Sequence, residues 1–127
     1  QNLVIWFNAN INQEDPIVVA SLLHYRFVRI HPFDDGNGRV ARLLMNCVFL
    51  KKDYPLVVIK SENKKEYLLA LNRADAGDLP AFTAHIAEQL LWSYELWIKA
   101  ANNQPFDEDN DLNKELELLK RNINKEN

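Results

Sequence analysis

Long apolar runs, separated by short polar stretches, make up most of this chain of 127 residues. The run 17–30 has about fourteen residues, more than an ordinary strand, and the Asp15–Pro16 pair before it is typical of a helix N-cap followed by proline at the first helical position. A second run, 39–52, ends in two lysines, which suit the negative C-terminal end of a helix. The pattern therefore predicts two buried helices joined by a short polar loop.

The other segments also favour helix. Residues 3–9 are apolar and fit a helix or a strand by pattern alone, and residues 56–59 fit a short extended piece. The segment 61–76 predicts a helix that ends at Gly77, and a long apolar helix is expected from Asp78 and Pro80 to about residue 101. Its large aromatic residues are expected to pack in the core: Phe82, Trp92 and Trp97. With five or six helices and almost no strand, the expected fold class is an all-α bundle.

Residues 102–127 are expected to lie outside this domain. They open with a polar, acidic linker and then place four apolar residues on one helical face: Leu112, Leu116, Leu119 and Ile123. Glu117 and Arg121 form an i,i+4 pair on this amphipathic helix. The helix would lead into a further domain or bind a partner, and the pattern does not decide between the two.

Composition narrows the function. The formal net charge of −3 gives no broad basic surface, so we expect no contact with nucleic acid. No stretch reaches the ~20 apolar residues of a membrane span, and no signal sequence opens the chain, so no membrane association is expected. The single cysteine, Cys47, excludes an internal disulfide and is expected in the core, as are His24 and His85. A second interpretation of His24, seven residues before His31 on the same helical face, is that it orients the loop.

The loop between the two central helices carries the chemistry. It reads IHPFDDGNGRVARLL from Ile30 to Leu44, and its glycines precede a helix start, where backbone N–H groups bind anions. Arg39 and Arg42 lie three residues apart on one face, which suits a polyphosphate. An aspartate beside phosphate implies Mg²⁺, and His31 is a group that can accept a proton at neutral pH. Each residue alone also fits a cap, a turn or a surface ion pair, but the set predicts transfer of a phosphate-containing group from a nucleotide.

The stretch HPFDDGNGRVAR, His31 to Arg42, resembles the signature of Fic-domain proteins, His-x-Phe-x-Asp/Glu-Gly-Asn-Gly-Arg-x-x-Arg, at every specified position. The resemblance implies an all-α Fic core over residues 1–101 that transfers AMP from Mg-ATP to a Tyr, Ser or Thr hydroxyl of a target protein, hence a cytoplasmic nucleotidyltransferase. It also implies residue roles. His31 would be the base, Phe33 would anchor the loop in the core, and Asp35 would hold Mg²⁺. Gly36, Asn37 and Gly38 would form the anion hole, Arg39 would contact the phosphates, and Arg42 would bind the γ-phosphate.

Several alternatives stay open. Gly38 favours AMP transfer, because a family relative with lysine there transfers phosphate, but transfer of phosphocholine or an idle nucleotide-binding module also fits the motif. Tyr67, Asn72 and Arg73 are candidates for the adenine side. The family's β-hairpin flap and its inhibitory helix, Ser/Thr-x-x-x-Glu-Gly/Asn, are not found in the sequence. We expect the flap to be missing with the N-terminal part of the domain, and inhibition to come from an upstream helix or a small antitoxin-like protein. The sequence does not indicate the oligomeric state.

Overall fold

The computed structural model describes residues 2–104, and within them every regular element is helical. The elements are α1 (Leu3–Asn10), α2 (Pro16–Ile30), α3 (Asn37–Lys51), the 3₁₀ turn η1 (Ser61–Asn63), α4 (Lys64–Asp75) and α5 (Leu79–Ala101). The expected all-α fold class is confirmed. The chain divides into two compact units, with the boundary after Glu95. None of the described helices is long and apolar enough to cross a membrane.

Local sequence signals set the helix starts. The side chain of Asp15 accepts a hydrogen bond of 2.8 Å from the backbone N–H of Ile17, and Pro16 occupies the first helical position of α2, as predicted. Asp78 caps α5 in the same way by accepting from Ala81. Residues 3–9, which the pattern left undecided, form α1, because Asn2 caps the segment by accepting from Val4 at 2.9 Å.

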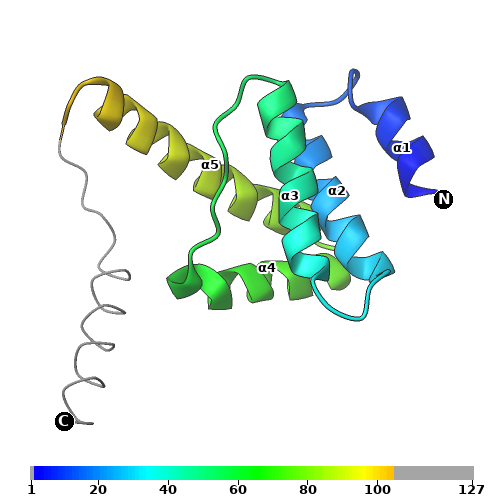
Figure 1. The fold of residues 1–127 in the computed structure, drawn as a ribbon. Coiled ribbons are helices and arrows are strands. Elements are labelled where there is room, and N and C mark those ends of the chain that lie inside the picture. The colour runs from blue at the N-terminus through cyan, green and yellow to red at the C-terminus, as the bar shows by residue number, and fades with distance from the viewer. Residues whose placement is uncertain (1, 105–127) are drawn as a thin grey trace, which may run out of the picture. The chain divides into compact units, whose positions relative to one another are not determined.

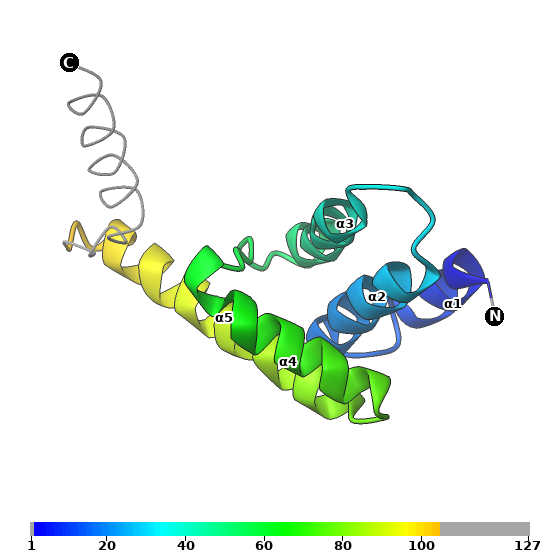
Figure 2. The ribbon, with the colours of Figure 1, turned by 90° about the horizontal axis from the view of Figure 1, so that it is seen from below.

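Helices α2 and α3 run side by side and are joined at one end by the polar loop 31–36 (Figure 1). Figure 1 shows helix α4 at the level of that end. In Figure 2, seen from below, α4 lies in front of α5, and the rings of Tyr67 and His85 bring the two helices together, with their centroids 6.3 Å apart. Apolar side chains from α2, α3 and α5 fill the space between the helices and are almost fully buried: Val19, Ala20, Met45, Phe49, Phe82 and Ile86. Burial of this kind contributes ~25 cal/mol per Å² of apolar surface and is the main force holding the helices together.

The side-chain amide of Asn46 bonds both backbone groups of Val57, in the segment between α3 and α4, as a neighbouring β-strand would. Asn46 of α3 accepts a hydrogen bond of 2.8 Å from the backbone N–H of Val57 and donates one of 2.9 Å to its carbonyl. The segment 54–60, which contains the candidate extended piece, has no regular secondary structure. Asn46 therefore holds it against α3 and places Val57 in the core.

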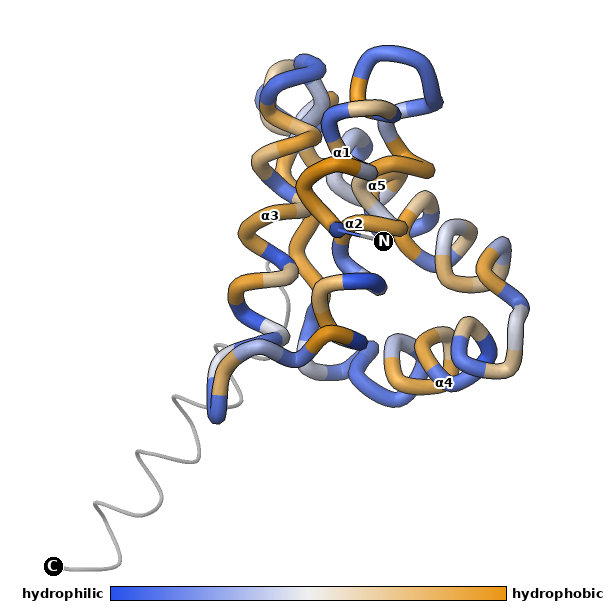
Figure 3. Tube along the Cα trace, turned by 90° about the vertical axis from the view of Figure 1, so that its right-hand side faces the viewer, coloured by the Kyte–Doolittle hydropathy of each residue, from blue (hydrophilic) through white to orange (hydrophobic). Residues whose placement is uncertain are grey.

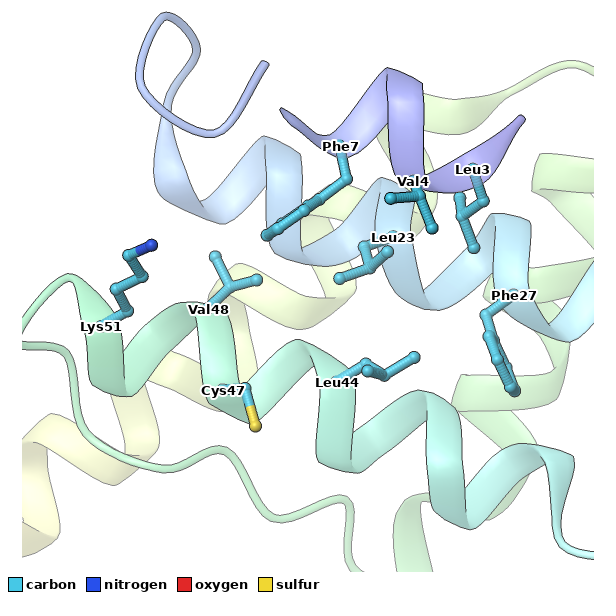
Figure 4. A pocket seen from close by; sticks show the side chains of 9 residues that line it. All are labelled: Leu3, Val4, Phe7, Leu23, Phe27, Leu44, Cys47, Val48 and Lys51. Atoms are coloured by element: carbon cyan, nitrogen blue, oxygen red, sulfur yellow. The ribbon is translucent and has the colours of Figure 1, made fainter. Parts of the chain in front are cut away.

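The burial of Cys47 and Trp97 differs from expectation. Cys47 is exposed and lies on the wall of an apolar cavity of about 430 Å³ between α1, α2 and α3 (Figure 4). Trp97, at the end of α5 that belongs to the second unit, is 58% exposed. In both cases the helical run is apolar on almost every side, so the sequence does not indicate which face of the helix is buried. Figure 3 shows the same ambiguity in α1, whose first turns are strongly hydrophobic although Val4 and Ile5 are exposed.

The expected amphipathic helix over residues 112–123 lies outside the described residues, and so does most of the acidic linker. The proposed boundary between residues 101 and 102 remains a prediction.

His24 and His85 are buried, as expected for core histidines. The Nε2 atom of His24 lies 2.8 Å from the Tyr67 hydroxyl, and its ring packs against Phe82. Burial, together with the charge of Arg42, lowers the pKa of His24 from 6.5 to about 4, and burial also lowers the pKa of His85. Both rings are therefore neutral in the folded protein near pH 7.

This lowered pKa predicts a loss of stability in mild acid. Because His24 titrates at about 4 when folded and near 6.5 when unfolded, the unfolded state binds more protons between these values. The free energy of unfolding should therefore fall by about 3 kcal/mol as pH drops from 6.5 to 4, as measured by urea unfolding at each pH. The variant His24→Leu should show a flatter profile, and an unchanged slope in that variant would contradict the assignment.

Candidate active site

The loop that follows α2 places His31 at the helix end with its ring exposed. His31 adopts the left-handed conformation (φ 50°) that ends α2, and its backbone N–H bonds to the Phe27 carbonyl. The Nδ1 atom lies 3.4 Å from the Val28 carbonyl oxygen. Since a carbonyl only accepts, this contact favours the tautomer with the proton on Nδ1. The Nε2 lone pair is then free to take a proton.

Asn37 closes the loop by holding both backbone groups of Phe33. Its Oδ1 accepts from the Phe33 N–H at 3.0 Å, and its Nδ2 donates to the Phe33 carbonyl at 2.6 Å. Asn37 is itself buried. The Phe33 ring, expected in the core, is instead 52% exposed, and its centroid lies 6.3 Å from that of the Phe27 ring. The loop is therefore anchored by an amide that bonds the backbone, because the short turn does not bring the phenyl ring inside.

The first turn of α3 presents unpaired backbone donors. Gly36 is the N-cap, in a left-handed conformation (φ 85°), and no side chain caps the helix. The first N–H groups of a helix have no intrahelical acceptor and carry the positive end of its dipole. A Cβ on Gly38 would meet nothing within 4 Å, so the space in front of this turn is open. The expected anion hole at residues 36–38 thus has the geometry to receive an oxyanion.

The two glycines of this turn should respond oppositely to alanine. Gly36→Ala forces a Cβ into a left-handed backbone and should lower the free energy of unfolding by about 1–2 kcal/mol. Gly38→Ala lies inside the helix, in open space, and should raise it by roughly 0.5–1 kcal/mol. Denaturant unfolding of both variants measures the two changes in the free energy of unfolding. Changes of equal sign and size would contradict the backbone conformations described for Gly36 and Gly38.

Asp35 and Arg39 form an exposed ion pair across the helix start. Arg39 Nη2 lies 3.0 Å from Asp35 Oδ2, while Asp35 Oδ1 accepts from the Gly36 N–H at 2.7 Å. Both side chains are largely exposed, and such pairs contribute only ~0–1 kcal/mol. A phosphate or a cation can therefore separate them at little cost. Asp34 is exposed in the same loop.

One cavity, of about 310 Å³, lies beside His31. Besides His31 it is lined by residues of α2 and α4: Tyr25, Val28, Arg29, Leu68, Leu71, Asn72 and Asp75. Asp75 accepts a hydrogen bond of 3.0 Å from the Tyr25 hydroxyl and lies 3.3 Å from Arg29. Two leucines and several polar groups thus form a site of mixed character next to the exposed ring. Of the three candidates for the adenine side, only Asn72 lies here.

A second cavity, of about 480 Å³, contains Arg42. Its other lining residues come from α3, the segment that Asn46 holds, and α4: Asn46, Val57, Val58, Ile59, Lys60, Ser61, Lys64 and Tyr67. Arg42 has no hydrogen bond or ion pair within the described residues 2–104. A partly buried guanidinium without a carboxylate favours an anionic ligand. Arg73, by contrast, pairs with Asp78 and lines neither cavity.

Sequence reasoning did not find two parts of this site. Asn46 builds the wall of the Arg42 cavity through its bonds to Val57, and Lys60 lies over the Trp92 ring at 3.7 Å while lining the same cavity. Neither residue belongs to a recognisable pattern, because each contact joins positions that are far apart along the chain.

Comparison with known proteins agrees with this architecture. The sequence model of the Fic/DOC family matches residues 1–49. A Fic domain containing signaling protein from Bacteroides thetaiotaomicron is 40% identical, with a TM-score of 0.77 over 83% of this chain and 46% of that one. Fic-1 from Caenorhabditis elegans is 37% identical, with a TM-score of 0.76 over 80% of this chain and 31% of that structure. The chain thus has the all-α Fic-domain fold.

Among curated proteins, this chain is similar to enzymes named protein adenylyltransferase. The relative from Caenorhabditis briggsae is 38% identical over 100 residues, which are 78% of this chain and 20% of that protein. The relative from Drosophila grimshawi is 38% identical over 101 residues, 79% of this chain and 21% of that protein. The chain therefore spans about a fifth of the length of the curated relatives it matches.

Proposed function

We propose that this chain is the catalytic part of a protein adenylyltransferase, which transfers AMP from Mg-ATP to a Tyr, Ser or Thr hydroxyl of a target protein. The names of its relatives support the reaction class. The observation that carries the proposal is the His31 ring, whose Nδ1 faces the Val28 carbonyl and whose Nε2 is left to act as a base. A base has no use in a site that only binds a nucleotide.

The phosphates of ATP would lie along the first turns of α3. Backbone N–H groups that follow Gly36 would bind one phosphate, Arg39 would contact the chain of phosphates, and Arg42 would bind the γ-phosphate. The spacing of three residues puts both guanidinium groups on one side of the helix. The nucleoside would occupy the cavity beside His31, where Leu68 and Leu71 offer apolar contacts and Asn72 offers a polar edge.

The residues present fit a magnesium ion that arrives with the nucleotide. No group of three or more acidic, histidine or cysteine side chains gathers within the described residues to form a protein-only metal site. Mg²⁺ in nucleotide sites commonly takes one or two carboxylates and completes its ligands with phosphate oxygens and water. Asp35, exposed at the anion hole, would supply that carboxylate, and the ion would neutralise charge on the phosphates.

The chemical step follows from these positions. His31 Nε2 removes the proton from the target hydroxyl, whose oxygen forms a bond to the α-phosphorus of ATP. The bond between that phosphorus and the oxygen bridging to the β-phosphorus breaks, and pyrophosphate leaves. The products are AMP esterified to the target, pyrophosphate and protonated His31. The helix start and the two arginines stabilise the charge that develops on the phosphates.

Two labelled nucleotides test the proposal. The protein is incubated with cell lysate and ATP labelled at the α-phosphate or at the γ-phosphate. Protein labelled from α-ATP alone supports AMP transfer. Label from γ-ATP alone would mean phosphate transfer and would refute the assignment drawn from Gly38. Mg-ATP binding without any transfer, even to a panel of candidate substrates, would leave the idle nucleotide-binding module as the better description.

A further inference from the structure

The buried pair of His24 and Tyr67 joins the core to the Arg42 cavity. His24 has no exposed surface, and its Nε2 lies 2.8 Å from the Tyr67 hydroxyl, with the two rings edge to face. Tyr67 is buried too, but it lines the cavity that contains Arg42. The charge of Arg42 acts on both rings: it adds to the lowering of the His24 pKa by burial, and it partly offsets the raising of the Tyr67 pKa by burial. The cavity thus holds Arg42, which has no carboxylate partner within residues 2–104, and it is lined by one member of a buried titratable pair.

Both members of the pair are neutral near pH 7. Burial lowers the pKa of His24 to about 4, and burial raises the pKa of Tyr67 above its usual value of 10.0. The neutral imidazole carries one proton, on Nδ1 or on Nε2, and the phenol carries another. The hydrogen bond between them uses one of these two protons, so the second must find another acceptor.

The surroundings of His24 Nδ1 decide where the protons lie. That atom is buried and has no hydrogen-bond partner in the described part of the chain. A proton on Nδ1 would leave a donor without an acceptor inside the core, which is rarer and costlier than an unused lone pair. The proton therefore belongs on Nε2, which donates to the Tyr67 oxygen. The Tyr67 proton is then left to be donated elsewhere, and the Arg42 cavity is the open space that Tyr67 lines.

We propose that His24 is a positioning residue that orients the Tyr67 hydroxyl as a hydrogen-bond donor to the nucleotide phosphate bound by Arg42. The inference rests on the proposed function, in which Arg42 binds the terminal phosphate. Arg42 and Tyr67 then form a subsite made of donors alone. Such a subsite accepts a fully ionised phosphate and excludes groups that must themselves donate. The nucleoside triphosphate is thereby distinguished from the diphosphate, which lacks the terminal group.

Nuclear magnetic resonance of ¹⁵N-histidine-labelled protein tests the orientation without any ligand. Long-range ¹H–¹⁵N spectra distinguish the two neutral tautomers, and the His24 signals are assigned by their loss in His24→Leu. We expect the proton on Nε2 from pH 6 to 8. A proton on Nδ1 would overturn the proposal, whether or not the protein binds ATP.

Binding of ATP and ADP tests the subsite itself. By calorimetry on the full-length protein with Mg²⁺, Tyr67→Phe should weaken ATP binding about 10- to 100-fold and leave ADP binding nearly unchanged, since a hydrogen bond to a charged group is lost only with ATP. His24→Leu should reduce the same ATP preference, and His24→Gln, whose amide can donate to Tyr67, should restore part of it. Tyr54→Phe, outside both cavities, serves as the matched control.

The outcomes separate the two proposals. Equal losses for ATP and ADP in Tyr67→Phe would refute the subsite while the proposed function stands. Absence of ATP binding in the unmodified protein would refute the proposed function and, with it, the phosphate as the acceptor for Tyr67. Thermal unfolding of each variant shows whether a loss of affinity reflects a loss of folded protein.

Discussion

Replacing His31 by alanine should slow AMP transfer by about 10²- to 10⁴-fold, the usual contribution of a general base. The affinity for Mg-ATP should change by only a few fold, because the N–H groups of α3, Arg39 and Arg42 remain in place. Transfer of label from α-labelled ATP measures the first quantity, and calorimetry with a non-hydrolysable ATP analogue measures the second. A variant that keeps the full transfer rate would show that another group removes the proton.

The backbone at this position calls for a second variant. His31 has a left-handed backbone (φ 50°), so alanine at this position adds backbone strain. The alanine variant therefore changes the backbone energy of the loop as well as removing the imidazole. Asparagine tolerates this conformation better than alanine and cannot act as the base. His31→Asn should therefore lose transfer as fully as His31→Ala while keeping the stability of the unmodified protein. If only the alanine variant lost activity, the role of His31 would lie in the shape of the loop.

Replacing Asn37 by alanine should cost both stability and catalysis. The change removes the two hydrogen bonds to Phe33 and leaves their backbone groups with only water to bond, for a loss of about 1–3 kcal/mol in the free energy of unfolding. Transfer should fall by about 10²-fold, because a displacement of the reacting base by ~1 Å costs that much. Urea unfolding and the labelling assay give the two numbers.

Asn10→Ala is the matched control for that experiment. Asn10 donates a side-chain hydrogen bond of 2.6 Å to the Trp6 carbonyl in α1, remote in sequence from the loop. It should lower stability in the same direction and leave the transfer rate per folded molecule unchanged. If both variants lost transfer to the same degree, the loss would reflect general destabilisation, and the proposed function of the Asn37 bonds would be wrong.

The parts of the fold that follow from local chemistry are readable in the sequence. Asp15 before Pro16 marks the start of α2, and Asp78 marks the start of α5, because a cap bonds to an N–H two or three residues away. The order of glycine, asparagine and arginine likewise predicts an open helix start, since every group involved lies within six residues.

Contacts between distant residues are not readable in this way. Tyr67 meets His24 across 43 positions, and Asn46 meets Val57 across 11, and no periodicity links either pair. The exposure of Cys47 could not be predicted from the sequence for another reason. A run that is apolar on every side gives no preferred face, so packing against α1 and α2 decides which side chains reach the core.

Because Asn46 bonds the backbone of Val57 in particular, the length of the segment between α3 and α4 determines which side chains face the core. Around Val57, which is 2% exposed, Leu56 and Val58 are 47% and 58% exposed, so the segment alternates like a strand with a period of two. Deleting one residue between Tyr54 and Val57 would bring Val58 to Asn46 and turn every later side chain to the opposite face. Lys60 would then leave the wall of the Arg42 cavity. We therefore expect homologous chains to tolerate substitution in this segment far more readily than a change in its length.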